Sequence, residues 1–257
     1  MDKYAFELKD ITFSYPVSEP VLRGLTLQIL DGESLCILGA NGCGKSTLLR
    51  ILGGLLIPQE GSFCFHGRVI DWRSITKKDA ADYHLRVGYV FQDSDVQLFC
   101  GSVLEEIAFG PLQTGLPREE IMDRVTSLAR SLDIEKLLDK APYHLSGGEK
   151  KKVAIASTLI LDPDVLILDE PTNDLDPRSQ TWLLKLLKDL RNQGKTLIFA
   201  THNLELVPHV ADRAILFAED HTLRADKPVR ELLEDTALLR EVNLVDEHFH
   251  THPWDFE

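Results

Sequence analysis

The segment GANGCGKST, Gly39–Thr47, constrains the fold of this chain more than any other part of its sequence. An apolar run, Cys36–Leu38, precedes it, and a segment of helical character, Leu48–Leu52, follows it. A strand, a glycine-rich loop and a helix in this order form a phosphate-binding loop, whose backbone N–H groups and helix N-terminus converge on phosphate oxygens. Lys45 is expected to reach the β- and γ-phosphates of a nucleotide, and Ser46 to bind Mg²⁺.

One residue of this loop has two interpretations. A helix N-terminus lowers the pKa of a nearby thiol, so Cys43 is either a reactive cysteine or a small filler residue. The residues expected to surround the phosphates are Gly39, Ala40, Asn41, Gly42, Cys43, Gly44, Lys45, Ser46 and Thr47.

Composition narrows the possible partners. The chain has 257 residues, of which 44% are hydrophobic, enough for one α/β domain or two tightly joined subdomains. Its 28 basic and 41 acidic side chains give a net charge of −13, which argues against nucleic acid or anionic lipid as a direct partner. Membrane contact is therefore expected through a protein. The absence of a long apolar run or a signal peptide, and four cysteines without paired spacing, favour the cytosol.

Periodicity predicts how the chain is organised. Apolar residues alternate with polar ones in 4–13, 25–29, 63–70 and 87–91, which suggests half-buried antiparallel strands. Helical spacing from about residue 93 to 160 indicates an inserted helical subdomain. Two fully apolar strands, 165–168 and 196–200, flank a helix with Asp176 as N-cap and Gly194 beyond its end, and so predict a βαβ unit. The fold class is thus α/β, with a phosphate-loop core, an antiparallel β subdomain and an α-helical subdomain.

Polar residues follow three predicted strands. Asp169 and Glu170 end the strand 165–168, where Asp169 is placed to hold Mg²⁺ and Glu170 to orient the attacking water. His202 follows the next strand and is expected at the same edge of the sheet, as a sensor of the γ-phosphate. Gln92 closes the strand 87–91 and could touch Mg²⁺ or the water through its amide. The predicted catalytic residues are Glu170, His202, Lys45 and Gln92.

The segment Leu145–Glu149, LSGGE, predicts a second anion-binding helix end. Ser146 is a suitable N-cap, and Gly147 and Gly148 expose the amides behind it. Because one nucleotide does not need two such ends, the second is expected to serve another subunit, as in a two-fold dimer.

Taken together, the motifs resemble those of the ATP-binding-cassette ATPases, over about Leu8 to Leu216. The order is a tyrosine, the phosphate loop, a strand-end glutamine, LSGG, an Asp-Glu strand end, a loop with LDP and a histidine. The resemblance implies a head-to-tail dimer that holds two Mg-ATP between the phosphate loop of one subunit and the LSGG helix of the other. It also implies that Tyr15 stacks on adenine, although packing is a common alternative, and that Asp176 lies at the dimer contact. The ATP-binding residues outside the loop are Tyr15, Gln92, Ser146, Gly147, Gly148 and Asp169.

Two departures from the pattern concern the predicted dimer. Glu149 stands where the signature most often has glutamine, and Asn173 and Asp174 occupy a loop that usually holds smaller residues. Because Glu149 adds negative charge close to where a γ-phosphate would arrive, its side chain is expected to point away or to pair with a lysine.

The segments 91–99, 102–111 and 145–156 look like those of the ATPase subunits of energy-coupling-factor importers, most of all the cobalt and nickel branch. In that family a helix of a transmembrane coupling subunit docks beside the loop that begins with the strand-end glutamine, Gln92 in this sequence, called here the glutamine loop. A substrate-binding membrane subunit completes the importer. Residues Gln97–Phe99 are then expected at the contact. Val96, Leu98 and Phe99 form either an apolar docking patch or part of the helical core.

The two predicted parts of the chain are an ATP-binding domain, 1–245, and a tail, 246–257. His248, His250 and His252 alternate in the tail, which is either a nickel- or cobalt-binding segment or a solvated end. We expect a homodimeric ATPase on the cytoplasmic face of the cell membrane that imports cobalt or nickel. A vitamin importer of the same type and a soluble ATPase that remodels a cytosolic assembly are the alternatives.

Overall fold

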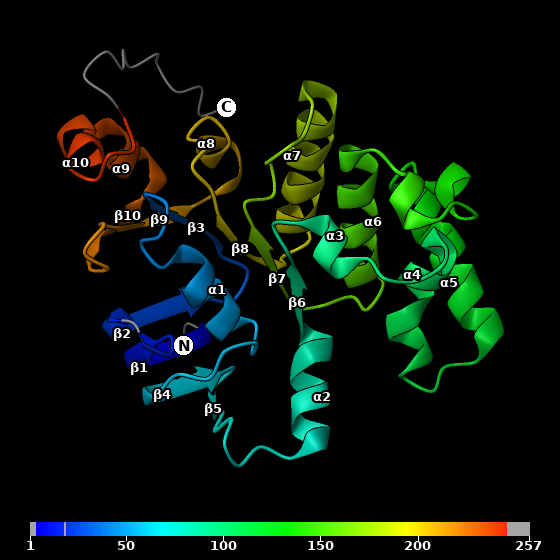
Figure 1. Cartoon of the computed structure of the whole chain (residues 1–257), viewed down its shortest axis with the longest axis horizontal. Coiled ribbons are helices and arrows are strands. Elements are labelled where there is room, and N and C mark those ends of the chain that lie inside the picture. The colour runs from blue at the N-terminus through cyan, green and yellow to red at the C-terminus, as the bar shows by residue number, and fades with distance from the viewer. Residues whose placement is uncertain (1–3, 18, 246–257) are drawn as a thin grey trace.

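The computed structural model describes residues 4–17 and 19–245, and within these residues no helix has the length and apolar character needed to cross a membrane. The tail with His248, His250 and His252 lies outside the described residues. The described part of the chain forms two sheets with helices on their faces and a group of helices to one side (Figure 1).

The antiparallel sheet contains β1 (Tyr4–Ser14), β2 (Pro20–Leu30), β4 (Glu60–Phe65) and β5 (Arg68–Val69), in the order β2-β1-β4-β5. Its alternating pattern buries one face, where Phe6, Leu8 and Phe63 pack with residues of α1 (Lys45–Leu52). The predicted antiparallel strands 4–13 and 25–29 are therefore confirmed. The segment 63–70 is instead a hairpin, in which a turn at residues 66 and 67 separates β4 from β5.

The second sheet is parallel apart from one edge. It contains β3 (Ser34–Gly39), β6 (Val87–Val90), β7 (Val165–Asp169), β8 (Thr196–Ala200), β9 (Arg213–Phe217) and β10 (Leu223–Pro228), in the order β10-β9-β3-β8-β7-β6. The prediction that 87–91 continues the antiparallel pattern was wrong, because β6 pairs in parallel with β7. Val87, Gly88 and Val90 are all buried, and four residues are too few for alternation to separate the two kinds of strand.

Helices cover both faces of this parallel sheet. One face packs on α1, and the other on α7 (Pro177–Asn192), α8 (Val207–Val210) and α9 (Val229–Glu234), beside which lies α10 (Thr236–Glu241). The predicted βαβ unit is β7-α7-β8. Asp176 caps α7 by accepting hydrogen bonds from the N–H groups of Arg178 and Ser179, and Gly194 beyond its end has a φ of +81°.

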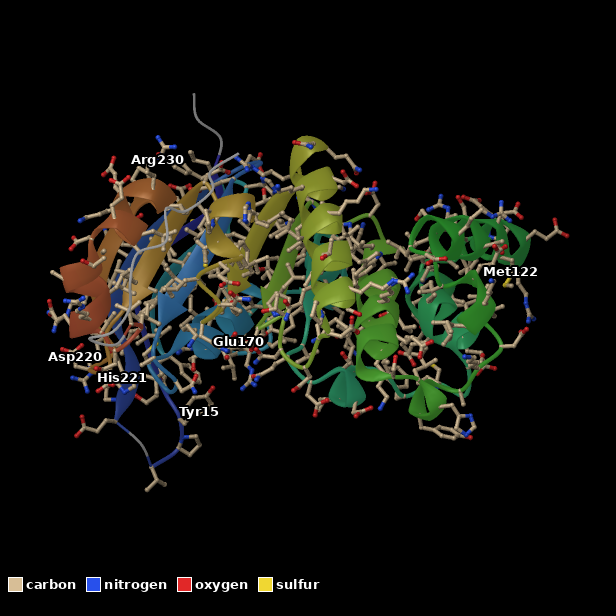
Figure 2. The ribbon with its side chains drawn as sticks, turned by 90° about the horizontal axis from the view of Figure 1, so that it is seen from above. Tyr15, Met122, Glu170, Asp220, His221 and Arg230 are labelled. Atoms are coloured by element: carbon tan, nitrogen blue, oxygen red, sulfur yellow. The ribbon has the colours of Figure 1, made fainter. Side chains whose placement is uncertain are left out.

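The helical subdomain contains α3 (Ser94–Gln97), α4 (Val103–Leu112), α5 (Arg118–Ser131) and α6 (Gly147–Leu159), with short 3₁₀ turns at Glu135–Leu137 and Pro142–His144. It has a core of its own, and α2 (Lys77–Arg86) leads into β6 before it. The subdomain projects sideways from the sheets, so that Met122 on α5 lies far from Glu170 (Figure 2).

Candidate functional site

The phosphate loop connects β3 to α1 as predicted from the sequence. Gly39, Gly42 and Gly44 have positive φ values of 147°, 84° and 114°. A Cβ at Gly39 would lie 2.6 Å from the Cys43 sulfur and 2.7 Å from the Phe217 carbonyl oxygen, so only glycine fits there. The first residues of α1 thus leave their amides for an anion.

Lys45 curls back over this loop. Its ammonium donates to the carbonyl oxygens of Gly39, at 2.8 Å, and Ala40, at 3.2 Å. The lysine therefore lies where phosphate oxygens would replace these carbonyls as partners.

The side chains expected to hold Mg²⁺ meet between α1 and the end of β7. The Ser46 hydroxyl donates to Oδ1 of Asp169 at 2.9 Å, and Asp169 is buried. Hydroxyl and carboxylate oxygens are hard donors of the kind that Mg²⁺ prefers, so the pair fits the ion. Gln92 is exposed, and it lines a cleft that Ser46 also lines.

Glu170 turns into the cleft because its backbone adopts a left-handed conformation, with φ of +44°. Its Oε2 accepts a hydrogen bond from the His202 N–H at 3.3 Å and lies 2.9 Å from Nδ1 of the same histidine. Oε1 is 3.8 Å from the Lys45 ammonium. The ends of β7 and β8 and the start of α1 therefore bring a buried carboxylate, an imidazole and a lysine together.

Lys45, Ser46, Gln92, Glu170 and His202 line a cleft of about 580 Å³. Tyr15 stands at the cleft, with its hydroxyl 3.3 Å from the Thr47 hydroxyl and its ring packed edge-on against Phe13. Asn173, which the sequence marked only as a departure from the pattern, also lines it. The lining of the cleft thus combines the aromatic ring of Tyr15 with the phosphate-loop residues, Lys45 and the Glu170 carboxylate.

The LSGGE segment, Leu145–Glu149, which forms the signature of the family, does not line this cleft. Ser146 caps α6, and Gly148 packs so closely on α7 that a Cβ there would lie 2.5 Å from the Ser179 hydroxyl. Glu149 turns back to Ser146, accepting from its N–H at 2.8 Å and from its hydroxyl at 2.9 Å. This capping box, rather than a lysine, holds the glutamate, and these two hydrogen bonds lower its pKa.

Sequence reasoning missed a lysine that ties the glutamine loop to α6. The buried Lys151 donates to the carbonyl oxygens of Phe91, at 3.1 Å, and Gln92, at 2.7 Å. Its neighbour Lys150 pairs with Asp95 at 2.6 Å. Lysine normally faces solvent, so the sequence signalled no more than a basic run on a helix.

The residues expected at a partner contact divide into two groups. Gln97 faces inward, donating to the Ala154 carbonyl at 2.9 Å and accepting from the Phe91 N–H at 3.1 Å. Leu98 packs partly buried against two hydrophobic clusters, so the docking interpretation was wrong for it. Val96 and Phe99 are 70% and 67% exposed.

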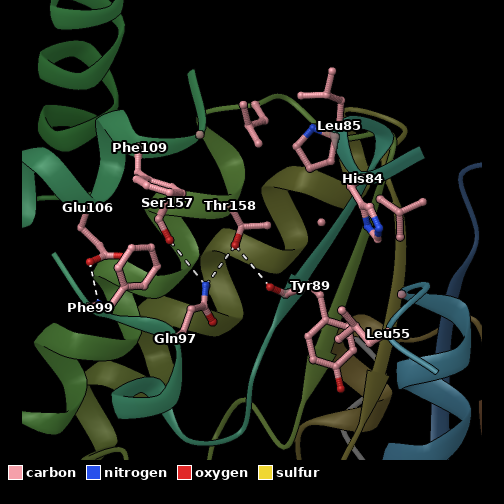
Figure 3. Close-up of a pocket in the computed structure, with 16 residues that line it drawn as sticks. Leu55, His84, Leu85, Tyr89, Gln97, Phe99, Glu106, Phe109, Ser157 and Thr158 are labelled. Atoms are coloured by element: carbon pink, nitrogen blue, oxygen red, sulfur yellow. Dashed lines mark hydrogen bonds between the residues drawn. The ribbon is translucent and has the colours of Figure 1, made fainter. Parts of the chain in front are cut away.

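Phe99 forms one wall of a second groove, of about 260 Å³, between the helical subdomain and the sheet (Figure 3). Phe109 packs edge-on against it with 5.0 Å between ring centroids, and Leu55 and Leu85 are also exposed and apolar. The floor of the groove is polar, because Gln97 donates to the Thr158 hydroxyl at 3.3 Å. An exposed apolar rim of this kind suits a protein partner.

Cys43 is the filler residue of the two interpretations. It is buried, and burial raises the pKa of its thiol, so the helix N-terminus does not make it reactive.

Comparisons with known proteins agree with this geometry. A family model described as ABC transporter matches residues 22–173. The nickel import ATP-binding protein NikO of Rhodobacter capsulatus is 46% identical over 94% of this chain and 96% of that protein. The energy-coupling factor transporter ATP-binding protein EcfA of Methanocaldococcus jannaschii is 41% identical over 94% of this chain and 85% of that protein.

Two solved structures have the same architecture. The structure of cbiO1 from Clostridium perfringens, described as part of the ABC transporter complex cbiONQ, gives a TM-score of 0.81 at 36% identity, covering 95% of this chain and 96% of that one. An ATP-binding cassette solved as a dimer in a post-hydrolysis state with ADP and phosphate gives a TM-score of 0.79 at 26% identity, covering 88% of this chain and 99% of that one.

Proposed function

This chain belongs to the ABC transporter family and is an ATPase, and we propose that it powers an energy-coupling-factor importer of cobalt or nickel ions. In this proposal two copies of the chain lie on the cytoplasmic face of the cell membrane. They attach to a transmembrane coupling subunit and, through it, to a substrate-binding membrane subunit. The name of the nickel import relative favours a metal ion over a vitamin as cargo.

The chemistry is hydrolysis of the γ-phosphate. Glu170 orients a water molecule and takes its proton as the water oxygen attacks the γ-phosphorus; the bond to the β–γ bridging oxygen breaks and ADP leaves. His202, 2.9 Å from the Glu170 carboxylate, holds that group in place, and Lys45 and His202 stabilise charge on the transferred phosphoryl group. Mg²⁺, held by Ser46 and Asp169 with Gln92 beside it, would neutralise charge on the phosphate oxygens.

A second copy of the chain completes the site. The N-terminus of α6, with Ser146 and Gly147, lies outside the cleft of its own chain and supplies an anion-binding end for the ATP of a partner. The relative solved as a dimer with ADP and phosphate supports this arrangement. ATP would close the dimer and hydrolysis would reopen it.

The observation that carries the importer proposal is the groove lined by Phe99 and Phe109. It lies directly beside the glutamine loop, which Lys151 joins to α6, so a helix docked there contacts a segment that also lines the ATP cleft. We assign the groove to an amphipathic helix of the coupling subunit. The exposed apolar side chains at the groove, Leu55, Leu85, Phe99 and Phe109, would contact the apolar face of such a helix.

Purification from native membranes in mild detergent tests the proposal. Mass spectrometry should identify two membrane-spanning subunits with this chain, and vesicles that contain the complex should take up cobalt or nickel when supplied with ATP. Uptake of a vitamin instead would contradict the metal assignment. Recovery of the chain only from the soluble fraction would favour an ATPase that remodels a cytosolic assembly.

A further inference from the structure

Among the described residues that line the groove, only Tyr89 has a side chain that hydrogen-bonds Asp169, the expected Mg²⁺ ligand. It lies in the middle of β6, the edge strand of the parallel sheet. Figure 3 shows its ring at the border of the groove, with the hydroxyl directed away from Gln97. The same side chain therefore contacts two places with different roles.

The hydroxyl of Tyr89 orients a carboxylate. It donates to Oδ2 of Asp169 at 3.3 Å, while Ser46 donates to Oδ1 at 2.9 Å, so each carboxylate oxygen has its own donor. Arg50 also hydrogen-bonds the tyrosine, and as a cation it can only donate.

The ring of Tyr89 is held tightly on the groove side. A Cβ at Gly53 would lie 2.7 Å from Cδ2 of the ring, and the ring of Phe91 packs against it with 4.8 Å between centroids. The backbone of β6 also packs on the groove floor. The Thr158 hydroxyl, which donates to the Ala154 carbonyl at 3.0 Å and accepts from Gln97 at 3.3 Å, lies 3.5 Å from the Tyr89 carbonyl oxygen, and a Cβ at Gly88 would lie 2.4 Å from the Thr158 methyl group. A shift of the groove floor therefore moves Tyr89 with it.

We propose that Tyr89 is a positioning residue, which fixes the Asp169 carboxylate for Mg²⁺ and makes that position depend on what occupies the groove. The part that concerns the groove rests on the proposed function, because it takes the occupant to be a helix of the coupling subunit. Hydrogen-bond partners of a metal-binding carboxylate fix its orientation, and their loss lowers the affinity for the metal.

The role of the hydroxyl can be tested on the isolated full-length chain with Tyr89→Phe, which removes one oxygen atom. At saturating ATP, the Mg²⁺ concentration for half-maximal hydrolysis should rise about tenfold. Binding of ATP in EDTA should remain as in the parent, because the loop amides and Lys45 are unchanged. A Mg²⁺ titration that superimposes on that of the parent would overturn the proposal.

Tyr83→Phe is the matched control. Tyr83 is also buried and donates its hydroxyl to a backbone carbonyl, that of Leu52, without contact to Asp169. Its loss should lower the melting temperature and leave the Mg²⁺ titration unchanged. An equal shift of the titration in both variants would assign the effect of Tyr89→Phe to general loosening and overturn the positioning role.

The coupling to the groove is tested in the complete membrane complex. The ratio of ATPase activity in the complex to that of the isolated chain should fall about threefold with Tyr89→Phe. An unchanged ratio would overturn the coupling. Recovery of no membrane subunit with the parent chain would overturn the coupling and the proposed function together, whereas the Mg²⁺ titration decides the role of the hydroxyl independently.

Discussion

At the scale of single residues, a substitution of Glu170 should separate the rate of hydrolysis from the affinity for ATP. Its carboxylate contacts His202 and Lys45 from a left-handed backbone position that directs it into the cleft. Glu170→Gln keeps the shape and removes the base, so turnover should fall about 10²- to 10⁴-fold while ATP binding persists. Phosphate release and equilibrium nucleotide binding measure the two effects.

Lys45→Ala is the comparison for this variant. Because Lys45 lies over the phosphate loop, its loss should weaken nucleotide binding itself. Hydrolysis by Glu170→Gln at the parental rate would show that another group is the base.

Glu149 offers a second prediction at this scale. Its carboxylate holds the Ser146 hydroxyl and amide, and it brings a negative charge to the helix end assigned to the γ-phosphate of a partner. Glu149→Gln removes that charge, worth about 1 kcal/mol at a screened distance of a few ångströms, so ATP-induced dimerisation should tighten about fivefold. Sedimentation of the variant in a Glu170→Gln background measures this, and weaker association would contradict it.

At the scale of elements, Lys151 joins the glutamine loop to α6. Lys151→Met leaves the carbonyls of Phe91 and Gln92 without their donor, so the free energy of unfolding should fall by about 1–3 kcal/mol and ATPase activity should fall with it. The adjacent Lys150→Met removes a pair with the exposed Asp95 and should cost less than about 1 kcal/mol. Denaturant unfolding of both variants makes the comparison. Equal losses of unfolding free energy in the two variants would contradict the prediction that the buried contacts of Lys151 stabilise the chain more than the exposed ion pair of Lys150.

The sequence predicted the elements whose signal is local. The phosphate loop, the strand that ends in Asp169 and Glu170, and the capped helix α7 each carry their pattern within one continuous segment of the chain. Parallel strands end at one edge of a sheet, so the meeting of Glu170 with His202 also followed from chain order.

The errors and omissions share one cause, which is contact between distant segments. The pairing of β6 with β7 depends on burial from both sides, which four residues do not reveal. The inward turn of Gln97 and Leu98, and the burial of Lys151, depend on α6 lying against α3. The bond from Tyr89 to Asp169 likewise exists only because β6 and β7 are neighbours.

At the scale of the whole molecule, a substitution in the groove should impair association with the membrane partner without changing ATP hydrolysis by the isolated chain. Phe99 is 67% exposed, so Phe99→Ala should change the stability of the isolated chain by less than about 1 kcal/mol and leave its ATPase activity intact. The same variant should lose most of its membrane partner during purification. Val69→Ala is the control, because Val69 is equally exposed, at 67%, on the antiparallel sheet away from the groove. Equal recovery of the partner by both variants would place the docking surface elsewhere.

In the proposed dimer each ATP site is built from two copies of the chain, and mixing two inactive variants tests this arrangement. Lys45→Ala disables a phosphate loop, and Ser146→Arg blocks a signature helix. A mixed dimer contains one site with both defects and one site with neither. The mixture should hydrolyse ATP faster than the sum of the two variants measured alone, because one site of each mixed dimer is intact. A rate equal to that sum, with mixed dimers present, would show that one chain forms the site by itself.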